Sequence, residues 1–224
     1  VLELAAGTGI LTRKLRDLLP ADSHITATDL NSPMLDVARA KFESDERVQF
    51  ETADATQLPF DDSGFDVLVC QFGVMFFPDK QRSYEEAYRA LKPGGHYVFN
   101  AWGTLESNPF AKIAHETVAD LFPADPPGFY KVPFGYNETN NIIKSAMAVG
   151  FSNVKIETVD ITSNIPCFRD FATGLVFGNP LCEEIIARRG EPSSVCSAIA
   201  HALEHKLGSV MPLQALVVVA QKPQ

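Results

Sequence analysis

The first half of the chain alternates between strand-like and helix-like patterns of hydrophobic and polar residues. Val1–Leu4 is a short apolar run that predicts a buried strand, and Ile10–Leu19 carries apolar residues at helical spacing. Four more strands are predicted at residues 24–30, 48–54, 65–73 and 96–102. The third of these, FDVLVCQFG, is apolar on both faces, which is typical of a central parallel strand. The alternation predicts right-handed crossovers and a parallel sheet that is covered on both faces.

Two of the predicted helices carry recognisable signals at their ends. In SPMLDVARAKF, Ser32 is expected to cap the helix, with Pro33 at its first position. The helix in YEEAYRALKPGG is expected to stop at its proline and two glycines. Each helix would connect one strand of the sheet to the next.

After Trp102 the regular alternation ends. Helical patterns follow at 109–121, 138–149, 168–176, 181–188 and 194–207, and strand patterns at 153–161 and 213–220. We find no internal repeat and no low-complexity linker, so we interpret the second half as additions to one sheet. The prediction is therefore a single α/β domain over residues 1–224. Its doubly wound, mostly parallel, seven-stranded sheet would carry helical additions after strands five and six.

Composition and charge narrow the class of protein. With 224 residues, 46% of them hydrophobic, the chain is long enough to bury a sizeable core. Its net charge of −9 makes nucleic acid a poor partner. The four cysteines form no CxxC pair, which suits reduced thiols rather than a zinc ribbon or a disulfide framework.

No targeting or membrane segment is visible in the sequence. No apolar run approaches the roughly 20 residues that a transmembrane helix needs, and no signal-like segment opens the chain. We therefore expect a cytoplasmic protein without a transmembrane segment. Because the chain begins inside a predicted strand, we also expect further residues upstream of Val1.

Candidate binding residues follow three neighbouring strands at the point where each strand ends. Gly7 and Gly9 follow the first strand, Asp29 closes the second, and Asp54 closes the third. In a doubly wound sheet these carboxyl ends line one crevice, which is where ligands bind. A carboxylate such as Asp29 suits a ribose diol, and Asp54 suits an exocyclic amine such as that of adenine. The pattern predicts a nucleoside ligand with an extension that lies over the glycines.

A dinucleotide is the rival ligand for this glycine turn. Its fingerprint is GxGxxG, but GTGILT places Thr12 at the third glycine position. Glu3 also precedes the turn, where its charge would disfavour a pyrophosphate and favour an ammonium group. The residues therefore favour a nucleoside with a cationic tail.

Four spaced motifs carry a family resemblance from Val1 to about Trp102. They are VLELAAGTG, ATDLNSPMLDVAR, ADATQLPFDDSGFDVLVCQFGVMFF and ALKPGG. In this order they resemble the class I S-adenosylmethionine-dependent methyltransferases, which have a Rossmann-like fold. The likeness is greatest to the small-molecule group that includes the ubiquinone and menaquinone methyltransferases. The one departure is Ala5, which replaces the usual first glycine and is tolerable if its φ is negative.

The resemblance implies a set of cofactor-binding residues in this sequence. The methionine end of S-adenosylmethionine is assigned to Glu3, Ala5, Gly7 and Gly9. The adenosine end is assigned to Asp29 at the ribose, Leu30 and Met34 beside it, Asp54 at the adenine amine and the Ala55 N–H at a ring nitrogen. Gln71 would offer its carbonyl to the cofactor ammonium, with Phe72 beside it. The product would be S-adenosylhomocysteine, and no metal is expected.

The acceptor is expected to be a small, apolar, aromatic or quinol-like metabolite. The core sheet over 1–102 is committed to the cofactor, so the additions at 103–150 and 161–209 are predicted to cover the acceptor. The aromatic residues proposed for this pocket are Phe76, Phe129, Tyr130 and Phe134; as an alternative, these rings are plain core.

Three further alternatives stay open at this point. His115 is a weak candidate for a general base, and its other interpretation is a surface histidine. His201 and His205 in HALEH match a zinc-peptidase pattern, but we favour the edge of a helix's apolar stripe. The chain as a whole could be a non-catalytic S-adenosylmethionine-binding sensor or partner subunit instead of an enzyme. The sequence leaves the oligomeric state open.

Overall fold

The computed structural model describes residues 1–224, which form two compact units. The first unit consists of Val1–Ala101, Glu138–Glu157 and Leu216–Gln224. The second consists of Trp102–Asn137 and Thr158–Ala215. The single-domain organisation of the chain stays a prediction.

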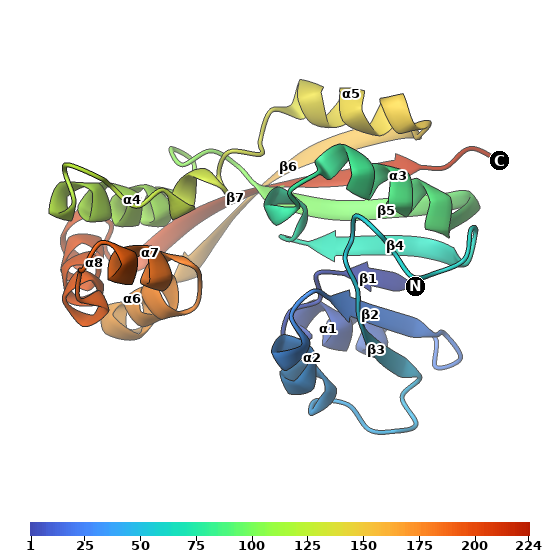
Figure 1. Ribbon diagram of the computed structural model, residues 1–224, viewed down its shortest axis with the longest axis horizontal. Helices are drawn as coiled ribbons and strands as arrows, with labels where there is room; N and C mark the ends of the chain where they lie inside the picture. The colour runs from blue at the N-terminus through green and yellow to red at the C-terminus, as the bar shows by residue number, and fades with distance from the viewer. The chain divides into compact units, whose positions relative to one another are not determined.

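Seven strands form one sheet in the order β3-β2-β1-β4-β5-β7-β6. Their bounds are β1 (Leu2–Leu4), β2 (Ile25–Asp29), β3 (Val48–Thr52), β4 (Phe65–Gln71), β5 (Leu91–Trp102), β6 (Ser152–Asn164) and β7 (Val210–Gln221). β1 pairs in parallel with β2 and β4, β2 with β3, and β4 with β5. β7 is antiparallel, and its arrow runs opposite to that of β4 in Figure 1. The predicted doubly wound, mostly parallel α/β fold is confirmed.

The helices begin and end within a few residues of the predicted bounds. Those of the first unit are α1 (Ile10–Leu18), α2 (Ser32–Arg39), the 3₁₀ turn η1 (Val74–Phe76), α3 (Lys80–Ala90) and α5 (Thr139–Val149). Those of the second are α4 (Pro109–Leu121), η2 (Phe129–Lys131), α6 (Phe168–Phe177), α7 (Leu181–Ala187) and α8 (Pro192–Lys206). No helix combines the length and the apolar character needed to cross a bilayer.

The predicted cap of α2 is wrong. The N-cap residue is Asn31, and Ser32 is already inside the helix; the Asn31 side chain makes no capping hydrogen bond. The Asn31 N–H donates instead to Asp29 Oδ1 at 2.8 Å. The end of β2 and the start of α2 are therefore held together by the carboxylate of Asp29.

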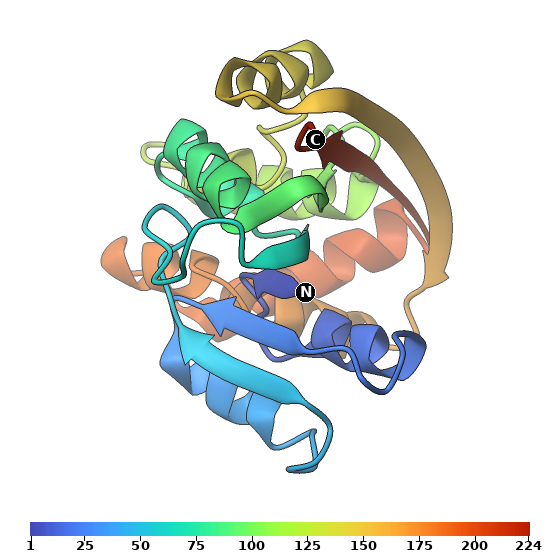
Figure 2. The same cartoon turned by 90° about the vertical axis from the view of Figure 1, so that its right-hand side faces the viewer.

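One face of the sheet in the first unit is closed by α3 and α5. The two helices contact each other and lie on the same side of the strands in Figure 2. Tyr84 of α3 is fully buried against Tyr97 and Phe99 of β5. Aromatic packing of this kind adds roughly 0.5–1.5 kcal/mol per pair to the free energy of burial.

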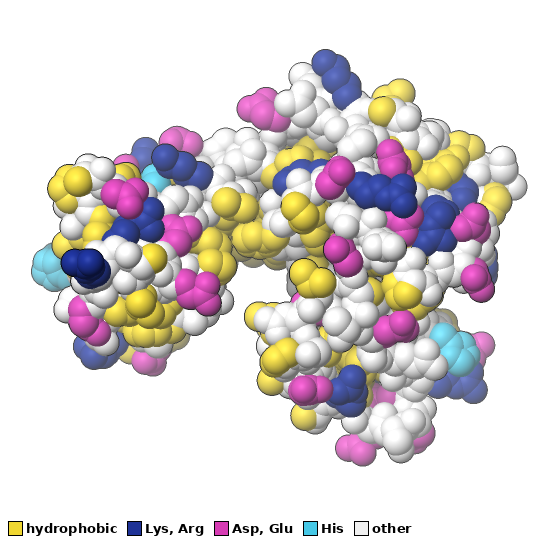
Figure 3. Space-filling view, viewed as in Figure 1, with side chains coloured by type: hydrophobic (Ala, Val, Ile, Leu, Met, Phe, Trp, Pro, Cys, Tyr) yellow, Lys and Arg dark blue, Asp and Glu magenta, His cyan; other side chains and the backbone are white.

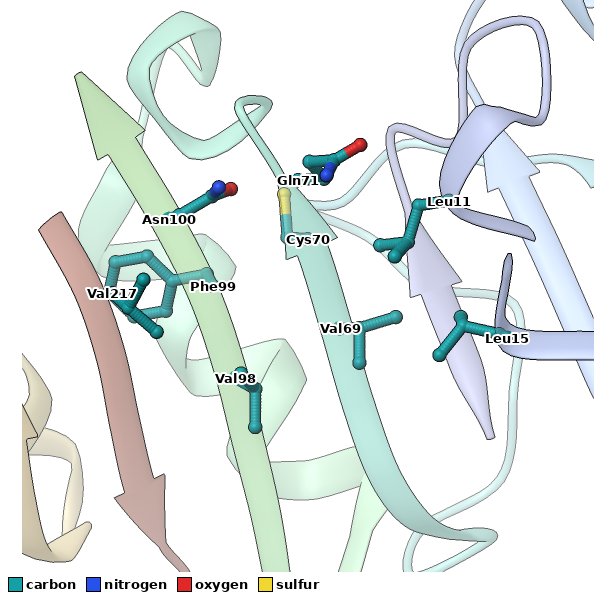
Figure 4. A pocket seen from close by; sticks show the side chains of 9 residues that line it. All are labelled: Leu11, Leu15, Val69, Cys70, Gln71, Val98, Phe99, Asn100 and Val217. Carbon is teal, nitrogen blue, oxygen red and sulfur yellow. The ribbon is translucent and has the colours of Figure 1, made fainter. Parts of the chain in front are cut away.

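The other face of this sheet has an open groove beside α1. Side chains alternate along β5, so Val98 and Asn100 point away from α3. They line an open groove of about 240 Å³, which we call the sheet groove. Its other lining residues belong to α1, β4, β5 and β7: Leu11, Leu15, Val69, Cys70, Gln71, Phe99 and Val217 (Figure 4).

The second unit has a core of its own, made by its helices. α8 packs against both α4 and α6. Trp102 stacks on Phe134 with ring centroids 5.7 Å apart, and Phe110 meets Phe134 edge to face. This apolar cluster is what the Phe- and Tyr-rich sequence after residue 102 builds.

Candidate functional site

A cavity of about 380 Å³ lies at the carboxyl ends of β1 to β4, and we call it the strand-end cavity. Its volume falls in the range of small-molecule sites. Most of the predicted cofactor residues line it: Ala5, Gly7, Asp29, Leu30, Met34, Asp54, Ala55 and Phe72. The lining residues that sequence reasoning missed are Thr28, Ala53, Gly73, Phe77 and Pro78. Phe76, predicted for the acceptor pocket, lines this same cavity.

The two glycines of the first turn have different reasons to be glycine. Gly7 has φ +56°, and a Cβ there would meet no atom within 4 Å. It faces open space, as a residue that a ligand approaches should. Gly9 has φ +78°, and its Cβ would lie 2.9 Å from the Ala38 Cβ. Packing of the turn against α2 therefore accounts for Gly9, while its predicted contact with the cofactor stays a prediction.

The expectation of a negative φ at Ala5 is wrong. Its φ is +52°, in the left-handed region, where an L-residue is disfavoured by roughly 1–2 kcal/mol. The methyl group is accommodated by Gly73, because a Cβ at Gly73 would collide with the Ala5 Cβ and come within 2.8 Å of Cys70 Sγ. A side chain at position 5 thus requires a glycine in the turn after β4, a pairing that no local pattern reveals.

Asp29 organises the centre of the cavity wall. Its Oδ2 accepts from the Gly7 N–H at 2.8 Å, and its Oδ1 accepts from the Asn31 N–H at 2.8 Å. A carboxylate has about four lone-pair positions, so acceptor capacity remains for two hydroxyl donors. The side chain is half-buried and negatively charged at a place where a polar ligand can reach it.

Asp54 is held by a local turn. Its Oδ1 accepts from the N–H and the hydroxyl of Thr56, at 2.8 and 2.7 Å. These two hydrogen bonds lower the pKa of Asp54. The carboxyl is therefore charged at neutral pH and able to accept from an amine in the cavity.

The carboxyl group of Glu3 is buried in an environment that disfavours its charged form. Its side chain is 1% exposed in β1, and Oε2 has no hydrogen-bond partner. Burial raises the pKa of Glu3 to about 7; the Asp29 charge acts in the same direction, and Thr12 opposes it. A buried carboxyl with one unpartnered oxygen favours a cation nearby, because the cation would stabilise its charged form.

The turn after β4 is fixed by a residue that sequence reasoning missed. Phe72 has φ +53°, and its N–H donates to Asn100 Oδ1 at 2.9 Å. Asn100 of β5 pairs with Gln71 of β4, so strand pairing brings it to this turn. The Gln71 side chain lines the sheet groove rather than the strand-end cavity (Figure 4). The predicted role of its carbonyl stays a prediction.

The remaining candidates lie in the second unit. Phe129, Tyr130 and Phe134 are 8%, 3% and 7% exposed within its core. The Tyr130 hydroxyl donates to the Leu175 carbonyl at 3.2 Å, and burial raises the pKa of Tyr130. The packing of these three rings is that of core residues, and their role in a pocket stays a prediction.

His115 of α4 has a buried Nδ1 without a hydrogen-bond partner. Burial lowers the pKa of this imidazole, and the Lys131 charge acts in the same direction. The ring is therefore neutral at neutral pH and able to accept a proton. His201 and His205 of α8 face each other with ring centroids 4.2 Å apart, and no group of three or more metal-ligating side chains is present.

Comparisons with known proteins agree with this geometry. The family described as "Methyltransferase domain" matches residues 1–95. The demethylmenaquinone methyltransferase of Clavibacter sepedonicus is 39% identical over 104 residues, which are 46% of this chain and 41% of the relative. The ubiquinone/menaquinone biosynthesis C-methyltransferase UbiE of Psychromonas ingrahamii is 36% identical over 116 residues, 50% of this chain and 46% of the relative. The chain thus spans less than half the length of these two curated relatives.

A solved structure extends the likeness over the whole chain. Phosphoethanolamine N-methyltransferase 2 of Haemonchus contortus, in complex with phosphomonomethylethanolamine and S-adenosylhomocysteine, covers 100% of this chain with 48% of its own. The TM-score is 0.61 at 22% identity, a likeness of fold alone. Residues 1–95 thus match a methyltransferase-domain family and the whole chain has the fold of a solved methyltransferase, which confirms the predicted resemblance to the class I S-adenosylmethionine-dependent methyltransferases.

Proposed function

We propose that the chain binds S-adenosylmethionine in the strand-end cavity and transfers its methyl group to a small, apolar, quinol-like acceptor. The observation that carries the proposal is a set of three carboxylates on neighbouring strands: Asp29 and Asp54 line the cavity, and Glu3 is buried in β1, the strand that leads into the glycine turn. Glu3, Asp29 and Asp54 match an ammonium, a ribose diol and an exocyclic amine in that order.

The residues fit this cofactor in shape as well as in charge. The open space over Gly7 accommodates the part of the ligand nearest Glu3. Leu30 and Met34 are exposed apolar side chains of the cavity wall, ready to cover the adenosine. The ammonium group of the cofactor would give Glu3 Oε2, which has no hydrogen-bond partner, a positively charged neighbour.

When bound, S-adenosylmethionine supplies a methyl group on a sulfonium sulfur. The chain's own contribution is to hold the acceptor close to that carbon and to keep water away. Phe72, Phe76 and Phe77 line the cavity, and we call them its aromatic wall; they would keep water away. No covalent nucleophile of the protein is needed for this transfer.

The acceptor class rests on the relatives and on surface charge. By their names, one of the curated relatives above is a demethylmenaquinone methyltransferase and the other a ubiquinone/menaquinone biosynthesis C-methyltransferase. Basic side chains are interspersed with acidic ones on the face seen in Figure 3, and the net charge is −9. This surface argues for a small molecule rather than a nucleic acid. Where the acceptor must lose a proton, His115 is the proposed base.

Two measurements test the proposal. Calorimetry with S-adenosylmethionine and with NADH should show binding of the first alone, and tight binding of NADH alone would end the idea. A screen of phenols, quinols, amines and thiols, read out as S-adenosylhomocysteine release, should then give turnover with an apolar aromatic acceptor. Cofactor binding without turnover on any acceptor would favour the sensor or partner-subunit function.

A further inference from the structure

Glu86 and Arg89 of α3 form an ion pair beneath the segment that follows Asp54. The Arg89 Nη2–Glu86 Oε2 distance is 2.8 Å, and the Glu86 side chain is nearly inaccessible, with the residue 3% exposed. The pairing with Arg89 lowers the pKa of Glu86, so the carboxylate is charged at neutral pH. Neither residue lines the strand-end cavity.

The pair grips residues 58–62 from both sides of the backbone. Glu86 Oε2 accepts from the Leu58 N–H at 2.8 Å, and Arg89 Nη2 donates to the Leu58 carbonyl at 3.0 Å. Arg89 Nη1 donates to the Phe60 carbonyl at 2.6 Å and reaches Asp62 Oδ1 at 2.8 Å. Charge-assisted hydrogen bonds of this kind are stronger than neutral ones, so this segment is pinned to α3.

The gripped segment continues directly into one wall of the cavity. Leu58 follows the Asp54 turn, in which the Gln57 N–H donates to the Asp54 carbonyl at 2.9 Å. Asp54 and Ala55 line the cavity. β3, from which this wall emerges, pairs only with β2 at the edge of the sheet, so the sheet supports the wall on one side alone.

The same helix also follows a second stretch of the cavity lining. Phe76, Phe77 and Pro78 line the cavity just before α3 begins, and Asp79 caps the helix by accepting from the Arg82 N–H at 2.9 Å. The two stretches of lining are thus connected through α3 by the cap at its start and by the ion pair near its end.

We propose that Glu86 and Arg89 are positioning residues that set the adenine selectivity of the cofactor site. They act by holding Leu58, and through it the Asp54–Ala55 turn, at a fixed distance from the aromatic wall. The inference rests on the proposed function, because it takes the adenine ring as the group that Asp54 and Ala55 face. Neither Glu86 nor Arg89 touches the ligand itself.

The test compares two ligands that differ only at the adenine edge. S-inosylhomocysteine carries an oxygen in place of the amine of S-adenosylhomocysteine and a ring N–H in place of the acceptor nitrogen. We expect the wild type to bind the adenine ligand about tenfold to a hundredfold more tightly, as for hydrogen bonds to charged groups. In Arg89→Lys and Glu86→Gln the ratio of the two dissociation constants should fall to within about threefold of one.

Arg82→Lys is the matched control, because Arg82 lies on the same helix and pairs with Glu86 but makes no hydrogen bond to residues 58–62. Its ratio should equal that of the wild type. Asp62→Asn removes only the exposed part of the grip, so it retains the fold and should lower the ratio partially. If every variant weakens both ligands by one common factor, or changes neither, the proposal is overturned. A wild type that binds neither ligand would contradict the proposed function itself.

Discussion

The aromatic cluster of the second unit and the strand-end cavity of the first differ in how their side chains are packed and paired. In the second unit, Phe129, Tyr130 and Phe134 are packed against one another, and the buried Tyr130 hydroxyl has a backbone partner. In the first unit, the Glu3 carboxyl is buried without a partner for Oε2, and the space over Gly7 is empty. Polar groups left with unused capacity mark the site here, whereas a high density of aromatic residues marks a core.

The largest effect is expected from breaking the second unit's core. Phe134→Ala should lower the free energy of unfolding by about 3–5 kcal/mol, because it removes a buried ring that touches Trp102, Phe110 and Tyr130. Urea denaturation would measure it, with the exposed Phe177→Ala as the control that should change little. A raised acceptor KM with unchanged stability would instead restore Phe134 to the acceptor pocket.

Glu3 should make stability and cofactor affinity respond to pH in opposite directions. Its pKa is raised to about 7 from an ordinary 4.5, so the folded chain holds this proton more tightly than the unfolded chain. Stability therefore falls as pH rises from about 4.5 to about 7, by about 3 kcal/mol at most. Affinity for a cationic ligand should rise as pH passes 7.

Glu3→Gln separates the two effects. The variant should be more stable than the wild type above pH 7, equal to it near pH 4.5, and weaker in cofactor binding at pH 8. Urea denaturation and calorimetry from about pH 4.5 to about pH 8.5 would show this, because that range includes the ordinary value of 4.5 and the raised pKa of about 7. If the stability and the cofactor affinity of the variant change with pH as those of the wild type do, Glu3 is not the group responsible.

Asp29→Asn should cost about 1.5–3 kcal/mol of cofactor affinity, because the charged acceptor facing the cavity is lost. Calorimetry with S-adenosylmethionine measures the loss. Asp36→Asn on α2 is the control, since Asp36 is exposed and pairs with Arg39 rather than lining the cavity. Equal affinities for Asp29→Asn and the control would show that Asp29 only shapes the backbone.

The smallest expected effects are two alanine-to-glycine substitutions that should change the free energy of unfolding in opposite directions. Ala5→Gly should raise the free energy of unfolding by up to about 1 kcal/mol, because it relieves a left-handed φ. Ala111→Gly, in helix α4 of the second unit, should lower it by about 1 kcal/mol or more, since glycine weakens a helix and empties a fully buried site. Two losses of equal size would contradict the strain at Ala5.

Features of the site that depend on local pattern were predictable from the sequence. The order of strands and helices follows from periodicity, and polar residues at the ends of parallel strands meet at one edge for topological reasons. Asp29, Asp54 and Gly7 were found in this way, and all three line the strand-end cavity. The chain's family resemblance rests on the same local motifs.

Features that depend on contacts between distant residues were decided only by the tertiary structure. Asn100 supports Phe72 across a strand pair, and Gly73 makes room for Ala5. The N-cap of α2 is Asn31 rather than the predicted Ser32, and the Asn31 N–H donates to the carboxylate of Asp29. The burial that raises the pKa of Glu3 is likewise a property of the assembled sheet. A sequence states which groups follow each strand, but their partners and their exposure to water exist only once the strands are side by side.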